Sequence, residues 1–178
     1  MMKLTTIALL AGCLLILPAC IKKARLQRGN KAPSFNLQDE TGAWRSLDEF
    51  HGKKVVLYFY PHDDSPGCTE QACSFRDKAA LYAENNIVVL GISYDSPESH
   101  AAFKAKYRLP FILLSDPNRE VAEAYGAKSG IPLVNRFFPN RVTFLIDAQG
   151  NIIKMLQDID VSTYAEGVLE EFEKNTNS

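Results

Sequence analysis

Two apolar runs separated by an amphipathic stretch constrain the fold of this chain more than any other feature. Residues 55–60 and 87–93 are continuous apolar segments of strand length, which is typical of strands covered on both faces. Between them, apolar residues recur at spacings of four and three from Cys68 to Tyr82, as on one face of an α-helix. This order predicts two parallel strands joined by a right-handed crossover. We therefore expect an α/β fold with the 55–60 strand near the centre of the sheet.

The remaining segments predict further strands and helices of one domain that covers residues 32–178. Residues 34–38 alternate like an edge strand, and the helix that begins near Cys68 is expected to end at Asn85-Asn86. Residues 148–151 have the composition of a hairpin turn. We also expect strands at 111–114, 141–147 and 152–156, a helical turn at 46–50, and helices at 96–107, 120–125 and 162–174.

The amino terminus does not belong to this domain. Leu4 to Ile21 is almost uninterrupted apolar sequence behind Lys3, as in a secretory leader. It ends in Leu17-Pro18-Ala19-Cys20, which resembles the lipobox of bacterial lipoproteins, where cleavage before the cysteine leaves a thiol that is diacylated. We expect residues 1–19 to be a signal peptide and Cys20 to be a lipid anchor. The protein would then be a membrane-anchored lipoprotein of the bacterial cell envelope.

Two alternatives to this anchor remain open. Leu10-Ala11-Gly12-Cys13 fits the lipobox locally, but it leaves an apolar region of only about nine residues, which is short for a leader. The segment could also stay as a transmembrane helix, since about 18 to 20 apolar residues span a bilayer. Basic residues are more frequent after the segment than before it, and this bias argues against export because positive charge tends to stay cytoplasmic.

Charge limits the partners of the chain. Residues 20–31 form a basic linker that would favour anionic lipid headgroups beside a membrane. The whole chain has a formal net charge of −1, so it lacks the basic field that attracts nucleic acid. We expect no nucleic-acid binding.

Only two of the four cysteines lie in the domain, Cys68 and Cys73, and two cysteines do not make a structural disulfide framework. Cys68 is expected to open a helix just past the carboxyl end of the central strand, where open α/β sheets hold their ligand sites. Free backbone N–H groups and the positive end of the helix dipole favour a thiolate there, and the thiolate is the nucleophilic form. Position alone leaves a buried, unreactive cysteine equally open.

Pro61, Ser65 and Cys68 form a Pro-x-x-x-Thr/Ser-x-x-Cys motif, and Arg141 opens the separate run Arg-Val-Thr-Phe-Leu-Ile-Asp. Both segments resemble the active site of peroxiredoxins of the bacterioferritin-comigratory, or Q, type, and the resemblance covers most of residues 30–170. It implies a thioredoxin-like fold, with a central mixed sheet flanked by helices. It also implies a thiol-dependent peroxidase for hydrogen peroxide and organic hydroperoxides.

The resemblance assigns a role to each matched residue. Cys68 would be the peroxidatic cysteine, Ser65 would hydrogen-bond the sulfur and the peroxide, and Pro61 would shield the site. Arg141 would hold the thiolate and polarise the peroxide, because a fixed cation stabilises the charge that builds as the O–O bond breaks. Attack would leave a sulfenic acid on Cys68, with which Cys73 would condense to an intramolecular disulfide.

Helix geometry makes that disulfide demanding. Five residues along an α-helix correspond to a rise of about 7.5 Å and a rotation of about 140°, which separates the two Cα atoms by roughly 8 to 9 Å. Disulfides need less than about 7 Å. If Cys68 and Cys73 share one regular helix, its first turn must unwind for the bond to form.

Several further residues are less strongly indicated as part of the active site. His62 is expected to be an exposed loop histidine, and Arg136 to be a surface residue. Arg76 and Asp77 are expected to form a local ion pair, although the resemblance gives Arg76 some claim to supporting the site. Structural roles are expected for Trp44, His51 and His100.

No cofactor or metal is implied, since the electrons come from thiols. A thioredoxin-like protein is the expected electron donor, and an intramolecular disulfide favours a monomer because no partner subunit is needed. Two alternatives share the fold. A membrane-anchored thiol-disulfide oxidoreductase would use Cys-x-x-Cys and a copper chaperone Cys-x-x-x-Cys, whereas four residues separate Cys68 from Cys73.

Overall fold

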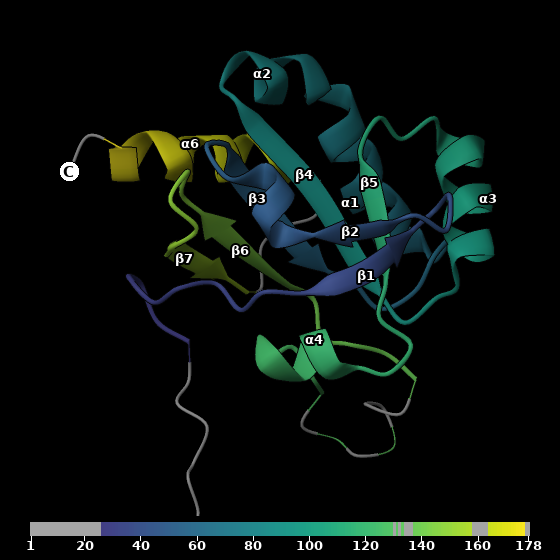
Figure 1. Ribbon diagram of the computed structural model, residues 1–178. Helices are drawn as coiled ribbons and strands as arrows, with labels where there is room; N and C mark the ends of the chain where they lie inside the picture. Colours follow the sequence, from purple (N-terminus) through teal and green to yellow (C-terminus); the bar gives the residue numbers. More distant parts are fainter. Residues whose placement is uncertain (1–25, 130, 132, 134–136, 158–163, 177–178) are drawn as a thin grey trace, which may run out of the picture.

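The computed structural model describes residues 26–129, 131, 133, 137–157 and 164–176. A seven-stranded mixed sheet forms the centre of the molecule, with helices on both faces (Figure 1). Its order is β2-β1-β5-β4-β3-β6-β7. The strands are β1 (Asn36–Asp39), β2 (Trp44–Ser46), β3 (Lys54–Phe59), β4 (Ile87–Ser93), β5 (Ile112–Ser115), β6 (Val142–Ile146) and β7 (Ile152–Leu156). The helices are η1 (Leu47–Phe50), α1 (Pro66–Asp77), α2 (Ala79–Glu84), α3 (Pro97–Tyr107), α4 (Glu120–Ala124) and α6 (Tyr164–Thr176).

The predicted strand-helix-strand unit is confirmed. β3 pairs in parallel with β4, β4 pairs in parallel with β5, and β6 pairs antiparallel with the other edge of β3. This arrangement places β3 inside the sheet, as its uninterrupted apolar sequence predicts. The hairpin between β6 and β7 is also present.

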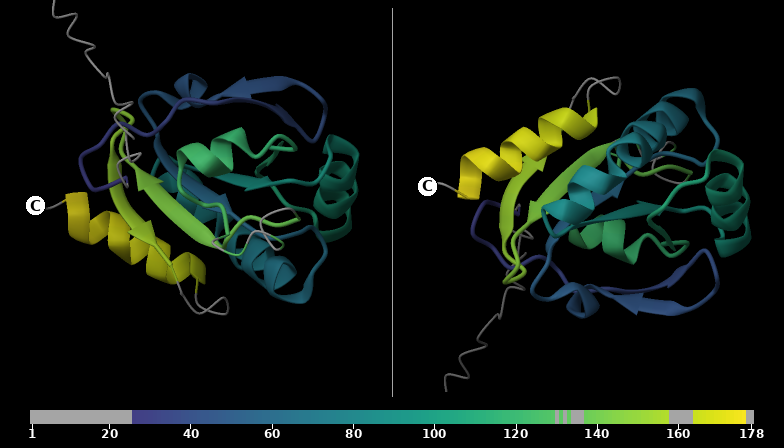
Figure 2. Two further views of the ribbon diagram at one scale, coloured as in Figure 1. Left: turned by 90° about the horizontal axis from the view of Figure 1, so that it is seen from below. Right: turned by 90° about the horizontal axis from the view of Figure 1, so that it is seen from above.

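Two hydrophobic cores lie on opposite faces of the sheet. Val56, Tyr58 and Tyr60 of the β3 segment face one core, to which α1, α2, α3 and α6 contribute apolar side chains. Val55, Leu57 and Phe59 alternate with them and face the second core, with η1 and α4. Figure 2 shows α6 lying beside α1 on one face of the sheet and α4 on the other. The period of two in a strand thus makes β3 the shared wall of both cores.

Two element predictions were wrong in detail. Residues 34–38 were expected to form an edge strand, but β1 is inserted between β2 and β5, and β2 is the edge. β2 has only three residues, too few to give a periodic signal. The helix expected from near Cys68 to Asn85-Asn86 does begin close to Cys68, at Pro66, but it is interrupted at Lys78, where φ is −107° and ψ is 9°.

Side chains at and after that interruption contact α6. Lys78 forms an ion pair with Glu166 at 2.9 Å, and the Tyr82 hydroxyl donates to the Ala165 carbonyl oxygen at 2.8 Å. The sequence pattern does not reveal an interruption of one residue, because the apolar face with its 3.6-residue period continues across it.

The amino-terminal end of the described chain is held by the β6–β7 hairpin. The Gly29 amide donates to the Ile152 carbonyl oxygen at 2.8 Å, and the Ala32 amide donates to the Gly150 carbonyl oxygen at 3.0 Å. The last residues of the expected linker are therefore folded onto the domain. The expected signal peptide, Cys13 and Cys20 lie outside the described residues. Of the helices that the structure describes, none combines the length and apolar composition that a membrane crossing requires.

Candidate active site

Cys68 lies in the first turn of α1, which follows the carboxyl end of β3 across residues 60–65. Ser65 is the N-cap residue and Pro66 occupies the first helical position, where its missing N–H is not needed. The Cys68 side chain is only 2% exposed, and its backbone N–H donates to the Ser65 carbonyl oxygen at 3.1 Å. The positive end of the helix dipole therefore acts on a sulfur that water hardly reaches.

Arg141 supplies a full positive charge to this sulfur. It directly precedes β6, whose Val142 pairs with Phe59 at the end of β3. This register carries the guanidinium to the start of α1, where Nη2 donates to Cys68 Sγ at 3.3 Å. Nη1 donates to Gln71 Oε1 from the same helix. Two acceptors on α1 thus fix the plane of the guanidinium against the sulfur.

The loop between β3 and α1 carries the other two motif residues. Pro61 is half-buried beside the buried Tyr60. The Ser65 hydroxyl donates to the His62 carbonyl oxygen at 3.0 Å, so it is engaged within the loop in this state. Its expected hydrogen bond to the sulfur and the peroxide stays a prediction for the substrate-bound site.

A buried polar cluster behind this loop was not predicted. The Asp63 carboxylate accepts hydrogen bonds from the Tyr60 hydroxyl at 2.7 Å, the Ser99 hydroxyl at 2.7 Å and His100 Nδ1 at 2.9 Å. Asp63 and His100 are 5% and 0% exposed. The sequence predicts a structural role for His100 but does not indicate its partner. The sequence signal was weak, because 37 positions separate the two residues.

These contacts set the ionisation of the cluster. Burial alone would raise the pKa of Asp63, but the hydrogen bonds from His100, Tyr60 and Ser99 outweigh it, so the pKa lies below its ordinary value. Burial, followed by the neighbouring charges, raises the pKa of Tyr60 well above its ordinary value. The Tyr60 hydroxyl therefore stays protonated and donates to the carboxylate.

Asp95 connects the same loop to the end of β4. Its Oδ2 accepts from the Asp63 backbone N–H at 2.9 Å and from the Ser93 hydroxyl at 2.7 Å, and its Oδ1 pairs with His62 Nδ1. The His62 side chain is 55% exposed, which confirms the prediction of an exposed loop histidine. Two carboxylates therefore hold the loop that delivers the chain into α1.

Cys73 lies farther along α1 and is half-buried. Both Cys68 and Cys73 are free thiols in this structure, and both lie within one continuous helix. Arg76 forms the predicted ion pair with Asp77, at 2.8 Å, and its Nη1 also donates to Cys73 Sγ at 3.3 Å. Each cysteine of the domain thus has its own arginine.

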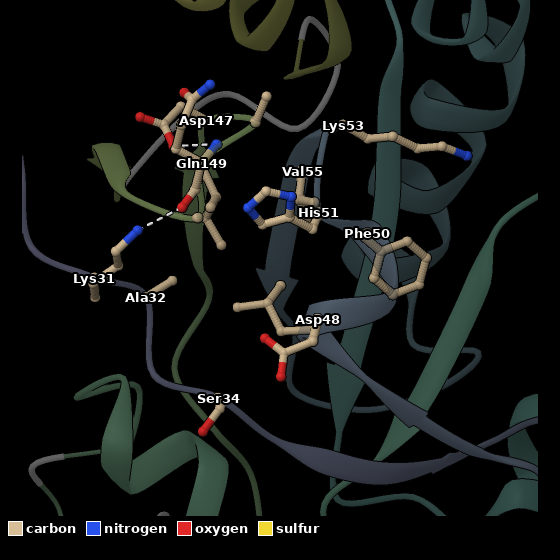
Figure 3. Close-up of a pocket in the computed structure, with 14 residues that line it drawn as sticks. Lys31, Ala32, Ser34, Asp48, Phe50, His51, Lys53, Val55, Asp147 and Gln149 are labelled. Carbon is tan, nitrogen blue, oxygen red and sulfur yellow. Dashed lines mark hydrogen bonds between the residues drawn. The ribbon is translucent and has the colours of Figure 1, made fainter.

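Besides the site around Cys68, the chain has a predicted surface arginine and a separate pocket. Arg136 lies outside the described residues. Figure 3 shows a pocket lined in part by His51, Lys53 and Asp147. Its Val55 lies near the start of β3, whereas Cys68 follows the end of that strand. None of the described residues that line this pocket is a cysteine. The described part of the chain contains no group of three or more His, Cys, Asp or Glu side chains arranged to hold a metal ion.

Known proteins resemble this chain over most of its length. The model of the AhpC/TSA family matches residues 28–155. A Coxiella burnetii protein that carries the name of peroxiredoxin bcp is 45% identical over 149 residues, 81% of this chain and 97% of that protein. The chloroplastic peroxiredoxin Q of Populus jackii is 44% identical over 127 residues, which span 71% of this chain but 58% of that longer protein.

A solved structure extends the similarity to three dimensions. The crystal structure of peroxidoxin BcpB from Mycobacterium tuberculosis matches with a TM-score of 0.78 and 33% sequence identity. The match covers 84% of this chain and 98% of the mycobacterial chain. The thioredoxin-like α/β fold with a central mixed sheet is thereby confirmed.

Proposed function

Because this chain belongs to the AhpC/TSA family, as a peroxiredoxin of the Bcp/Q type, we propose that it reduces hydrogen peroxide and organic hydroperoxides with Cys68 as the attacking nucleophile. One observation carries the assignment of the residue. Cys68 Sγ lies 3.3 Å from Arg141 Nη2 at the amino end of a helix, so both a full charge and a helix dipole stabilise a thiolate there.

The first step is the attack of the Cys68 thiolate on the terminal peroxide oxygen. The S–O bond forms as the O–O bond breaks, and the leaving oxygen takes a proton to become water or an alcohol. Sulfur is oxidised to a sulfenic acid and the peroxide is reduced by two electrons. Arg141 stabilises the negative charge on the leaving oxygen, and the nearby Ser65 hydroxyl is the second donor in our proposal.

In the second step Cys73 attacks the sulfenic sulfur of Cys68. The S–S bond forms as the S–O bond breaks, and hydroxide leaves and is protonated to water. Both cysteines lie in α1, where five residues of regular helix hold the Cα atoms roughly 8 to 9 Å apart, too far for a disulfide. Resolution therefore requires the first turns of α1 to unwind.

The contacts of α1 favour an unwinding that stops before its carboxyl half. Phe75 is fully buried and its ring lies 5.6 Å from that of Tyr164 on α6. The Ala165 backbone N–H donates to the Ser74 hydroxyl at 3.0 Å. The residues before Cys73 place only small side chains, Cys68 and Ala72, in the core around Phe75, and they are also held by Arg141, which contacts Cys68 and Gln71. Oxidation of Cys68 changes the group that Arg141 binds, which weakens the amino-terminal half first.

The setting of the enzyme completes the proposal. A thioredoxin-like protein would reduce the disulfide, and Cys20 would attach the chain to the cell envelope as a lipoprotein. An intramolecular disulfide needs no second subunit, so we propose a monomer. Membership of the peroxiredoxin family does not favour the oxidoreductase or copper-chaperone alternatives.

Peroxide consumption by the full chain in detergent, with dithiothreitol as the reductant, tests this function. We expect Cys68→Ser to abolish activity and Cys73→Ser to retain part of it, because the small thiol can reduce the sulfenic acid directly. If the wild-type chain consumed no peroxide above the dithiothreitol background, the proposed function would be wrong.

A further inference from the structure

A second arginine contacts a second sulfur in α1. Arg76 Nη1 lies 3.3 Å from Cys73 Sγ and 3.0 Å from the Tyr107 carbonyl oxygen. This nitrogen carries two hydrogens, one for each acceptor. Nε and Nη2 both lie 2.8 Å from Asp77 Oδ1. Two acceptors, the Tyr107 carbonyl oxygen and the Asp77 carboxylate, therefore hold the guanidinium while it contacts the thiol.

The position of Arg76 does not depend on the first turns of α1. Tyr107 is the last residue of α3, so its carbonyl oxygen belongs to the negative end of that helix dipole, which favours a cation. Asp77 lies at the carboxyl end of α1, beyond the buried Phe75. Cys73 and Arg76 are three residues apart, which places them on one helix face. The Arg76 contact can therefore persist while the segment around Cys68 unwinds.

We propose that Arg76 is the positioning residue of the resolving step. It holds the Cys73 sulfur at the folded end of α1 and stabilises its negative charge, so that the sulfur attacks the Cys68 sulfenic acid as it arrives. This role rests on the proposed function, since it assigns a residue within its second step. The electrons move from the Cys73 thiolate to the Cys68 sulfur, and the S–O bond breaks to release water.

Slower resolution has a chemical signature. A sulfenic acid that is not resolved can react with a second peroxide to give a sulfinic acid and one molecule of water or alcohol. Arg76 would therefore also decide how much peroxide the enzyme tolerates before Cys68 is irreversibly oxidised.

The test compares Arg76→Gln and Arg76→Lys with Arg108→Gln. Arg108 is an exposed cation that lines the same surface pocket as Arg76, so its variant removes an equal charge from the same region. In a Cys68→Ser background of the full chain, alkylation of Cys73 by iodoacetamide at pH 7 is followed by peptide mass spectrometry. We expect about a three- to tenfold slower reaction for Arg76→Gln, partial retention for Arg76→Lys and a rate within about twofold of wild type for Arg108→Gln.

A second measurement uses the chains with both cysteines. With one equivalent of hydrogen peroxide, the rate of Cys68 oxidation should be the same in wild type and Arg76→Gln, because Arg141 is untouched. With excess peroxide and dithiothreitol, the sulfinic fraction at Cys68 should rise several-fold in Arg76→Gln and not in Arg108→Gln.

The outcomes separate the two proposals. If Cys68 is oxidised normally but Arg76→Gln changes neither Cys73 alkylation nor the sulfinic fraction, the role of Arg76 is overturned and the peroxidase stands. If peroxide oxidises Cys68 in no variant, the proposed function fails instead. Should Arg76→Gln not fold, Arg76→Lys decides, because a point charge cannot contact the sulfur, the carbonyl and the carboxylate in one plane. A wild-type alkylation rate in that variant would overturn the proposal.

Discussion

Single side chains at the start of α1 determine whether Cys68 can carry a negative charge. Cys68 is almost fully buried, and a buried thiolate is costly unless a partner compensates it. Arg141 provides that partner, and Gln71 holds Arg141 by its other nitrogen. The arginine therefore acts as a fixed donor rather than as a mobile surface cation.

Replacement of Arg141 tests this assignment. We expect Arg141→Gln to slow the reaction of Cys68 with hydrogen peroxide by about 10²-fold, since a preorganised donor to the developing charge is lost. Arg141→Lys should recover only part of the rate, because lysine cannot contact Gln71 and the sulfur as a planar fork. Competition with a reference peroxidase measures the rate constant. Arg108→Gln is the matched control, and an equal rate in Arg141→Gln and Arg108→Gln would contradict the role.

At the scale of elements, the loop of residues 61–65 is held from α3 and the end of β4. Asp63 accepts three side-chain hydrogen bonds, two of them from Ser99 and His100 on α3, while Asp95 accepts its backbone N–H. The loop that precedes Cys68 is thereby fixed before any substrate arrives. Such fixing lowers the cost of placing donors around a peroxide.

Asp63→Asn tests this contribution. At pH 7 we expect the free energy of unfolding to fall by about 1 to 3 kcal/mol, because buried donors lose a charged acceptor. The folded-state pKa of Asp63 lies below its ordinary value of 3.8, so its carboxylate stabilises the fold above that pH. That stabilisation is lost as the pH falls through the folded-state pKa. Urea unfolding from pH 7 to pH 3 should therefore show the difference from wild type shrinking below pH 3.8.

The neighbouring Asp64 supplies the control for that series. It lies in the same loop but is exposed, where it pairs with Lys106. Asp64→Asn should change stability less than Asp63→Asn, since exposed ion pairs contribute little. A constant difference between wild type and Asp63→Asn down to pH 3 would contradict the assigned ionisation.

Helix α1 is the element that has to change during the proposed cycle. Hydrogen exchange should show the amides of residues 69–72 exchanging faster in the peroxide-oxidised chain than in the reduced chain. The amide of Asp77, whose helical acceptor is the Cys73 carbonyl oxygen, should keep most of its protection. The reason is that Phe75 stays in the core while the first turns open. A Cys73→Ser chain, which cannot form the disulfide, should not show the change. A crystal structure with the 68–73 disulfide in an intact helix would contradict the proposed unwinding of α1.

At the scale of the whole molecule, the question is how the folded domain would be joined to its proposed membrane anchor. The described chain is already held to the β6–β7 hairpin at Gly29 to Ala32, so a lipid on Cys20 would be joined to the domain by only a few further residues. An enzyme attached in this way would act on peroxides close to the membrane.

Replacement of Cys20 tests the attachment. We expect Cys20→Ser to lose acylation and membrane association when the full chain is expressed in a bacterium, whereas Cys13→Ser should behave as wild type. Membrane fractionation and mass spectrometry of the mature amino terminus measure both. Loss of acylation in Cys13→Ser instead would show that Cys13 is the lipidated residue. An uncleaved chain that stays in the membrane in both variants would support a transmembrane segment.

Much of the architecture could be predicted from local sequence. The apolar run of β3, the helix expected at 96–107 and the β6–β7 hairpin each depend on residues close in the chain, and each is present. The position of Cys68 after β3 follows from the same patterns. These features are encoded locally because strand period, capping and turn preference involve neighbouring residues.

Only the tertiary structure decided which distant side chains meet. The Asp63–His100 contact, the Gln71–Arg141 contact, the Arg76–Tyr107 contact and the insertion of β1 between β2 and β5 all join separate elements. Their sequence spacing follows no period, since it depends on how the helices pack against the sheet and on the register of its strands. The sequence by itself therefore determined most of the elements and the position of Cys68 after β3, while packing determined the groups that contact its sulfur.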